Sequence, residues 1–345
     1  CPSGVEYGKL LDIGRKAVAA QVPRSSPQRA LRWLLKEGLT SRAFAPAMRL
    51  GQAVRPLLPA ALRAKVPQRV APGPWPQRPH ARRVLLPEGC VQPAMLPHIN
   101  HASARVLDAA GLQVLRLPQG GCCGALRLHL DDHSGALAQM RANIDAWWPH
   151  VRPDSAQPVE AIVSNASGCG VLLKDYGHQL RHDPAYAAKA QRVSELARDI
   201  SELLPDLLPA LQRKLALADA ARSPAVPRPK LAYHPPCTLQ HGQQLRGGVE
   251  QGLRALGFEV QTARTEAHLC CGSAGTYSVL QAGLSSQLRE RKLGHLGELG
   301  AEQIVSANIG CITHLQSGTQ TPVRHWIEVL DEALTAAAEA EAAAV

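Results

Sequence analysis

The stretch Gly121-Cys-Cys-Gly-Ala125 places two adjacent cysteines before a glycine, and Leu269-Cys-Cys-Gly-Ser273 repeats the pattern later in the chain. In each copy thirty-one or thirty-two residues separate a single cysteine from the pair, and another single cysteine follows the pair. This arrangement uses eight of the nine cysteines of the chain, and its repetition predicts a duplicated structural unit. The eight are Cys90, Cys122, Cys123 and Cys169 in the first copy and Cys237, Cys270, Cys271 and Cys311 in the second.

The residues around the cysteines repeat as well. Gly111-Leu-Gln-Val114 corresponds to Gly257-Phe-Glu-Val260, and Ile162-Val-Ser164 corresponds to Ile304-Val-Ser306, seven residues before the last cysteine of each copy. Short apolar strands alternate with stretches of helical periodicity, which is typical of parallel sheets. We therefore expect an α/β protein with two similar tandem lobes, each with a small, mostly parallel sheet, preceded by a helical basic segment.

The expected elements follow the same order in both lobes. We expect strands at 83–86, 111–114 and 161–164 and helices at 97–110 and 134–148 in the first lobe, and strands at 231–233, 257–260 and 303–306 and a helix at 280–296 in the second. Between them, residues 186–218 read as helix with a break near Pro205. Proline-rich linkers are expected at 67–79 and 223–229. These features divide the chain into residues 1–82, 83–222 and 223–345.

The positive charge of the chain is concentrated before the first lobe. Fifteen lysines and arginines but only one acidic residue lie from Arg15 to Arg83, so this segment has a net charge of about +14. Because the whole chain has a net charge of +10, the remainder is acidic, at about −4. Aromatic residues are not interleaved with these bases, and we expect no nucleic-acid partner. The segment favours either docking onto an acidic protein or anionic headgroups, or a solvated face with no partner.

Sets of four cysteines at this spacing favour metal binding. A disulfide between adjacent cysteines is strained, whereas two neighbouring thiolates on a tight turn can both reach one metal centre. Four thiolates hold either tetrahedral zinc or an iron–sulfur cluster. Ligands gathered from three distant loops favour a cluster, more so in the second lobe, while zinc stays open for the first.

Three histidines lie close in sequence to the cysteines of the second copy. His314 follows Cys311 by three residues and is either a further ligand or a hydrogen-bond donor to the centre. His234 and His241 flank Cys237, and we expect at most one of the three to be a ligand. The sequence contains no nucleophile elbow, phosphate-binding loop or dinucleotide fingerprint, which leaves electron transfer as the function that its residues permit.

The cysteine pattern resembles the Cys-Cys-Gly domains of the heterodisulfide reductase family and, more closely, the iron–sulfur subunits of bacterial glycolate oxidase. Residues that carry the resemblance span nearly the whole chain: Cys1-Pro-Ser-Gly-Val5, Leu10-Leu-Asp-Ile-Gly-Arg15, Asn143-Ile-Asp-Ala-Trp-Trp148, Ala166-Ser-Gly-Cys-Gly170, Cys237-Thr-Leu-Gln-His241, Cys270-Cys-Gly-Ser-Ala-Gly-Thr-Tyr277, Ala307-Asn-Ile-Gly-Cys311 and Val323-Arg-His-Trp-Ile-Glu328. The wider family often has Cys-x-x-Cys at the last position of each lobe, where this chain has Leu172 and His314.

The resemblance implies a role within a larger complex. Cys1 would be the last ligand of a ferredoxin-type run, and residues 1–82 would include the remnant of a ferredoxin-like domain holding [4Fe-4S] clusters. Flavoprotein subunits carrying FAD would oxidise glycolate to glyoxylate, and this subunit would pass the electrons towards a quinone. It would be cytoplasmic and peripheral on the inner face of the membrane, and inactive on glycolate alone.

Two alternative functions remain open at this point. One is an iron–sulfur subunit of a lactate-utilisation or anaerobic glycerol-3-phosphate dehydrogenase complex, which would share the lobes. The other is a zinc-stabilised scaffold that only assembles a complex. Metal content separates the second alternative from electron transfer, since only iron–sulfur clusters absorb visible light strongly.

Overall fold

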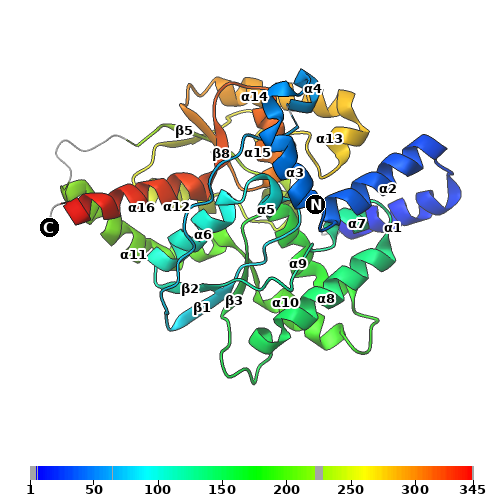
Figure 1. Ribbon diagram of the computed structural model, residues 1–345, viewed down its shortest axis with the longest axis horizontal. Helices are drawn as coiled ribbons and strands as arrows, with labels where there is room; N and C mark the ends of the chain where they lie inside the picture. The colour runs from blue at the N-terminus through cyan, green and yellow to red at the C-terminus, as the bar shows by residue number, and fades with distance from the viewer. Residues whose placement is uncertain (1–4, 6, 64, 222–227, 344–345) are drawn as a thin grey trace.

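Two parallel sheets of four strands form the centre of the protein (Figure 1). The structure is a computed structural model that describes residues 5, 7–63, 65–221 and 228–343, so Cys1 and most of the 223–229 linker lie outside the described residues. The strand order is β2-β1-β3-β4 in the first sheet and β6-β5-β7-β8 in the second. All neighbouring strands pair in parallel. The expected α/β fold with two similar lobes and parallel sheets is confirmed.

The two lobes contain similar successions of strands and helices, with one more helix before the fourth strand of the first lobe. The strands are β1 (Arg82–Leu85), β2 (Leu112–Leu115), β3 (Ala161–Ser164), β4 (Ala197–Asp199), β5 (Leu231–His234), β6 (Val260–Thr262), β7 (Gln303–Ser306) and β8 (Val323–His325). Helices of the first lobe are α5 (Gln92–Met95), α6 (His98–Ala109), α7 (Ala125–His129), α8 (His133–Val151), α9 (Ser167–Gln179), α10 (Ala187–Leu196) and α11 (Ile200–Ala221). In the second lobe a π-helical turn (η2, Thr238–Gly242) precedes α12 (Gly248–Ala255), α13 (Tyr277–Leu280), α14 (Ala282–Gly297), α15 (Ile309–Gln316) and α16 (Trp326–Ala343).

The fourth strand of each sheet was not expected, and the predicted helix break near Pro205 is wrong. The break occurs earlier, where α10 ends and β4 pairs with β3, and α11 then continues through Pro205 and Pro209. Leu204, Leu207 and Leu211 on α11 are almost completely buried. Their packing outweighs the hydrogen bonds that the two prolines remove.

The two lobes exchange helices. The helix that follows β4, α11, packs on α12 of the second lobe, and its counterpart after β8, α16, packs on α6 of the first lobe. These helices also pack on each other, at the left of Figure 1. The larger hydrophobic cluster therefore includes residues from both sheets, while a smaller one around Trp147 and Tyr176 belongs to the first lobe alone.

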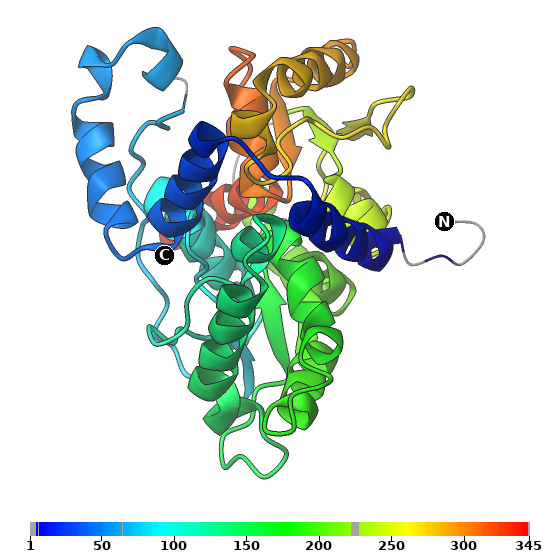
Figure 2. The ribbon, with the colours of Figure 1, turned by 90° about the vertical axis from the view of Figure 1, so that its right-hand side faces the viewer.

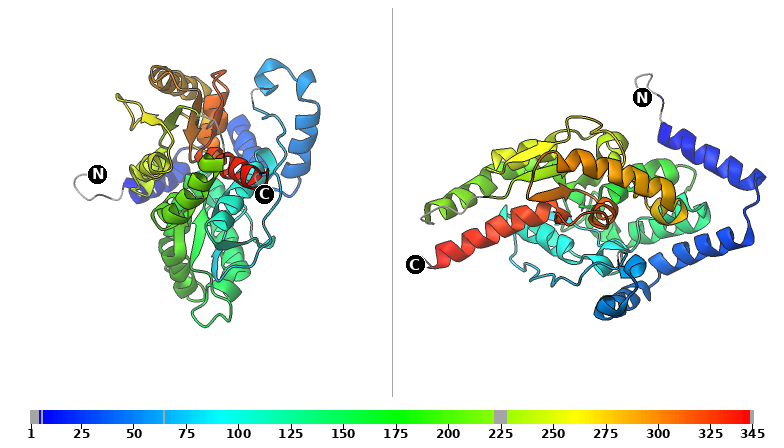
Figure 3. Two further views of the ribbon diagram at one scale, coloured as in Figure 1. Left: turned by 90° about the vertical axis from the view of Figure 1, so that its left-hand side faces the viewer. Right: turned by 90° about the horizontal axis from the view of Figure 1, so that it is seen from above.

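The basic N-terminal segment is helical, as expected, and lies outside the two lobes (Figure 2). It contains α1 (Tyr7–Gln21), α2 (Ser26–Thr40), α3 (Phe44–Ala53), the 3-10 turn η1 (Arg55–Leu57) and α4 (Ala60–Arg63). Seen from above, α1 and α2 project from the body of the protein (Figure 3, right). Arg24 and Arg32 pair with Asp131 at 2.8 and 2.6 Å, and Lys36 pairs with Asp132 at 3.1 Å. Part of the positive charge thus holds α2 against the first lobe.

Residues 67–80 form neither helix nor strand, as their prolines predicted, but they are fixed to the first lobe. Arg105 on α6 donates to the carbonyl oxygens of Pro72 and Pro74 at 3.1 and 2.9 Å, and His101 bonds that of Gly73 at 2.8 Å. The same Arg105 pairs with Asp331 of α16. This arginine therefore connects the extended segment with both lobes.

Within the part of the chain that the structure describes, none of the helices combines the length and the apolar character needed to cross a bilayer.

Candidate metal centres

Each set of four cysteines lies at the carboxyl edge of its sheet. The single cysteines Cys90 and Cys237 follow β1 and β5, the adjacent pairs follow β2 and β6, and Cys169 and Cys311 follow β3 and β7. Strands that run in parallel bring their carboxyl ends to one edge, so ligands from three distant loops converge there. This edge is where open α/β sheets bind their ligands, and the topology explains how thiols far apart in the sequence meet.

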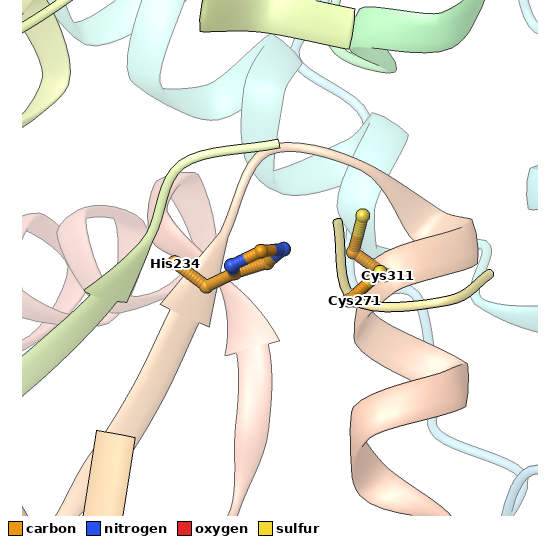
Figure 4. A group of neighbouring side chains, drawn as sticks. All are labelled: His234, Cys271 and Cys311. Carbon is orange, nitrogen blue, oxygen red and sulfur yellow. The ribbon is translucent and has the colours of Figure 1, made fainter. Parts of the chain in front are cut away.

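The four thiols of the second lobe lie close together. The Sγ atoms of Cys237 and Cys270 are 3.9 Å apart. The Sγ atoms of Cys271 and Cys311 and a ring nitrogen of His234 all lie within 4.8 Å of one another, and these three residues are buried. Figure 4 shows the imidazole directed towards the two sulfur atoms. This is a compact group of soft donors, of the kind that binds transition metals.

The glycine after the cysteine pair allows the loop to pass close to α14. Gly272 has φ +89°, and a Cβ at this position would lie 2.3 Å from the carbonyl oxygen of Ser285. Its N–H lies 3.3 Å from the Sγ of Cys270. A side chain would both strain the backbone and displace the loop, so the glycine is required for the turn that presents the two thiols.

The first lobe gathers its four thiols in the same order. Cys122 lies beside Cys90 and Cys123, and Cys123 lies beside Cys169. The pair is held from behind, because Asn143 donates to the carbonyl oxygen of Cys122 at 2.8 Å, and the hydroxyl of buried Tyr176 donates to that of Cys123 at 2.8 Å. Asn143 and Tyr176 thus act as positioning residues for the pair.

The contacts between thiols favour ionisation of one thiol in each pair. The neighbouring Cys123 and Cys90 lower the pKa of Cys122 to about 3. In the second lobe Cys237 and Cys271 lower the pKa of Cys270 to about 2. The pKa values of Cys90, Cys123, Cys237 and Cys271 are raised, first by the neighbouring thiol and then by burial. Each group therefore presents a thiolate, which is the form that binds metal.

Cys311 also has a lowered pKa, at about 5. The largest cause is the neighbouring Cys271, and the imidazole of His234 and the amide of Asn308 contribute. The Nδ2 of Asn308 lies 3.8 Å from the sulfur. Cys311 is in the first turn of α15, as Cys169 is in the first turn of α9, and the amides at a helix N-terminus favour negative charge.

His314 does not join the thiols of the second lobe. Its Nε2 lies 3.0 Å from the hydroxyl and 3.2 Å from the carbonyl oxygen of Ser285. A carbonyl only accepts hydrogen bonds, so this nitrogen carries the proton and is not free to bind a metal. The Ser285 hydroxyl donates in turn to the carbonyl of Gly272 at 2.8 Å. His314 therefore supports the cysteine loop from behind, and the ring of exposed His241 bonds the carbonyl of His268.

Turns that carry cysteines of the two groups meet at the contact between the lobes. The hydroxyls of Ser167, two residues before Cys169, and Thr238, directly after Cys237, are hydrogen-bonded at 2.7 Å. The amide of Ser167 donates to the carbonyl of Ala307 at 3.1 Å. Gln243 donates to the Ser167 carbonyl, also at 3.1 Å. The turns that carry these cysteines are thus held in direct contact.

The donor set fits a bound metal or cluster in each lobe. All eight described cysteines are free of disulfides; Cys122, Cys123, Cys271 and Cys311 are buried, and the other four are half-buried. Buried thiols that lie in contact, one of them ionised, repel further deprotonation unless a cation compensates the charge. Four soft thiol ligands suit zinc or iron–sulfur centres better than the hard cations magnesium and calcium.

Sequence reasoning named the eight cysteines, which the structure brings together in two groups, but did not name several residues around them. Asn143, Tyr176, Asn308 and Ser285 are bonded to the cysteine loops or to the thiols. No spacing rule identifies Asn143, Tyr176 and Ser285, because they reach the loops from other helices. Asn308 lies three residues before Cys311 in the same segment. Comparison of the two copies gave a partial signal for Asn308, because Asn-Ile-Gly-Cys311 has an asparagine where Ala-Ser-Gly-Cys169 has an alanine.

Comparison with known proteins agrees with this architecture. Residues 84–174 and 231–316 each match the family described as Cysteine-rich domain (CCG). The chain is 47% identical over 336 residues to the glycolate oxidase iron-sulfur subunit of Escherichia coli (strain K12), covering 97% of this chain and 79% of that protein. A probable glycolate oxidase iron-sulfur subunit of Bacillus subtilis (strain 168) is 27% identical, covering 93% and 74%. Lactate utilization protein A of Bacillus velezensis is 26% identical over 70% of this chain and 96% of its own length.

Two matched domains in tandem, each gathering four thiols at the edge of a parallel sheet, define a double cysteine-rich-domain protein. The chain belongs to the family of these proteins that includes the glycolate oxidase iron-sulfur subunits.

Proposed function

We propose that this chain is the iron–sulfur subunit of a glycolate-oxidising complex. In this proposal Cys90, Cys122, Cys123 and Cys169 hold one centre and Cys237, Cys270, Cys271 and Cys311 hold the other, with iron–sulfur clusters of the [4Fe-4S] type as cofactors. Such clusters accept and release single electrons when bound, which is the chemistry that the proposal requires. The observation that carries it is the pair of four-thiol groups, each partly buried, in a chain 47% identical to a glycolate oxidase iron-sulfur subunit.

The residues of this chain would hold and shield the two centres. Burial of Cys123, Cys271 and Cys311 keeps water away from the sulfur atoms, which limits loss of metal and oxidation. Hydrogen bonds between Ser167 and Thr238 fix the two cysteine turns against each other. A rigid contact of this kind suits electron transfer between two centres, because it costs no rearrangement of the protein.

Without a partner that carries a redox cofactor for this reaction, the described residues include no group that would oxidise a hydroxy acid. We therefore propose flavoprotein subunits that carry FAD as partners, with glycolate oxidised to glyoxylate there and a quinone on the acceptor side. The exposed bases of the N-terminal helices would support a peripheral position on the cytoplasmic face of a membrane. Cys1 as the last ligand of a ferredoxin-type cluster, and the division at residues 82 and 222, remain predictions.

The test is anaerobic purification of the full chain with and without its flavoprotein partners. We expect iron and acid-labile sulfide, broad visible absorption, and bleaching of this absorption by glycolate only when the partners are present. Zinc without iron in both lobes would instead identify an assembly scaffold, and zinc in the first lobe alone would restrict electron transfer to the second. Bleaching by lactate and not by glycolate would support the lactate-utilisation alternative.

A further inference from the structure

One buried histidine in the second lobe has no hydrogen-bond partner for either ring nitrogen. His234 is the last residue of β5 and is completely buried. Within the described part of the chain, neither its Nδ1 nor its Nε2 finds a partner. Leaving both polar atoms of an imidazole unsatisfied in the interior costs free energy, so this arrangement requires an explanation.

The other two buried histidines of this lobe do not share this property. The Nε2 of His325 bonds the carbonyl of Asn165, and its Nδ1 accepts from the amide of Ile327. His314 donates from Nε2 to Ser285. His234 alone among the three is directed towards sulfur, as Figure 4 shows for Cys271 and Cys311. Its environment is therefore that of a ligand whose metal would satisfy the free nitrogen.

The first lobe has no counterpart to this imidazole. His234 lies three residues before Cys237, and the residue three before Cys90 is Pro87. The sheet register agrees, because β5 and β1 pair equivalently with β7 and β3, and His234 is opposite Ser306. Proline offers no side-chain donor, so the duplicated unit has four donors in one lobe and five in the other.

We propose that His234 supplies a nitrogen ligand to the centre of the second lobe, alongside Cys271 and Cys311. The first lobe then holds a centre bound by thiolates only, and the second a mixed thiolate–imidazole centre. This inference rests on the proposed function, because it requires that the thiols bind metal. Both centres then have four thiolates, and the neutral imidazole adds no charge to the second. A thiolate at position 234 would add a negative charge and would lower the reduction potential of that centre.

Pulsed electron paramagnetic resonance of the full chain tests this assignment. The chain is produced with ¹⁵N-labelled histidine, purified anaerobically and reduced with dithionite. We expect a nitrogen hyperfine coupling of the size found for iron-bound imidazole, and its loss in His234→Ala. The matched control is His241→Ala. His241 lies four residues after Cys237, its exposed ring bonds the carbonyl oxygen of His268, and the variant should keep the coupling.

A second variant covers the case in which His234→Ala does not retain the centre. His234→Cys restores a ligand, so iron should stay bound while the nitrogen coupling disappears and the potential of one centre falls. An unchanged nitrogen coupling in either variant with iron retained overturns the inference and leaves the proposed function standing. Wild-type chain without iron or sulfide overturns the proposed function itself, and metal analysis reports this outcome before any spectrum is recorded.

Discussion

Acid should weaken the contact between the lobes through one buried histidine that lies away from the thiols. His325 ends β8, and its Nε2 lies 2.9 Å from the carbonyl oxygen of Asn165 in the first lobe. Its Nδ1 accepts from the amide of Ile327 at 3.1 Å. The carbonyl requires a proton on Nε2 and the amide requires a free Nδ1, so only the neutral ring satisfies both bonds. Burial, the largest cause, lowers the pKa of His325 to about 4, against the attraction of Glu328.

The magnitude follows from the difference between the folded and unfolded states. The unfolded ring titrates at about 6.5, and the folded ring resists protonation until about pH 4. The stabilisation is therefore complete above pH 6.5 and is lost as the pH falls towards 4, by about 1.4 kcal/mol for each pH unit. Over this range the loss reaches about 3 kcal/mol.

Urea unfolding of metal-free wild type and His325→Gln across this pH range measures the effect. The glutamine side chain does not titrate and retains one hydrogen-bond donor. The substitution should therefore lower the free energy of unfolding by about 1 kcal/mol, and this loss should not depend on pH. Wild type should therefore be the more stable protein at pH 7 and lose this advantage on acidification. His182→Gln, which replaces an exposed histidine, serves as the control and should follow wild type. Titration of the cysteines affects both proteins equally and cancels in the difference between them. A stability difference between wild type and His325→Gln that stays constant from pH 7 to 4 would therefore refute the reasoning.

Three further substitutions probe the cysteine loop, the shared core and the extended segment. Gly272→Ala should lose second-lobe iron, because its Cβ would meet a backbone carbonyl of α14 at 2.3 Å, whereas Gly283→Ala, with no atom within 4 Å, should keep it in metal analysis. Leu211→Ala should lower the free energy of unfolding by about 2–5 kcal/mol, and equal losses in exposed Leu217→Ala would contradict the packing argument. Arg105→Met should cost about 2–3 kcal/mol in urea unfolding and speed proteolysis between residues 67 and 80, and no change in either would show that these bonds do not fix the segment.

The parts of the fold that could be predicted are those with local signals. Glycines that end helices, apolar runs before cysteines and the repeat itself predicted three strands of each sheet, although β6 begins at Val260, the last residue of the strand expected at 257–260. The fourth strands, Ala197–Asp199 and Val323–His325, are three residues long and merge in sequence with the helices that follow them. Pro205 predicted a break that the structure lacks, because the leucines around it are buried between the lobes. Such packing depends on a partner helix far away in the sequence.

The site shows the same division between local and distant signals. Repetition of the cysteine spacing was enough to group Cys237 with Cys270, whose sulfur atoms lie 3.9 Å apart. It could not separate His314 from His234, since both lie three residues from a cysteine. The difference arises from direction: His314, on α15, turns to Ser285 on α14, while His234 at the end of β5 points to the edge where the loops meet. Sheet topology, and not spacing, determines which side chain faces the thiols.

The exchange of helices explains why the duplication produced one body with two centres. A lobe on its own would expose the face of α6 or α12 that the other lobe's terminal helix covers, and with it buried residues such as Leu253 on α12. Burial of this surface couples the folding of the two lobes, since neither core is complete without a helix from the other copy. It also brings Ser167 against Thr238 and so fixes one cysteine turn on the other. The packing that stabilises the fold therefore also sets the separation of the two centres. Pro87 and His234 occupy equivalent positions in the two copies, so the donors could diverge without a change in this packing.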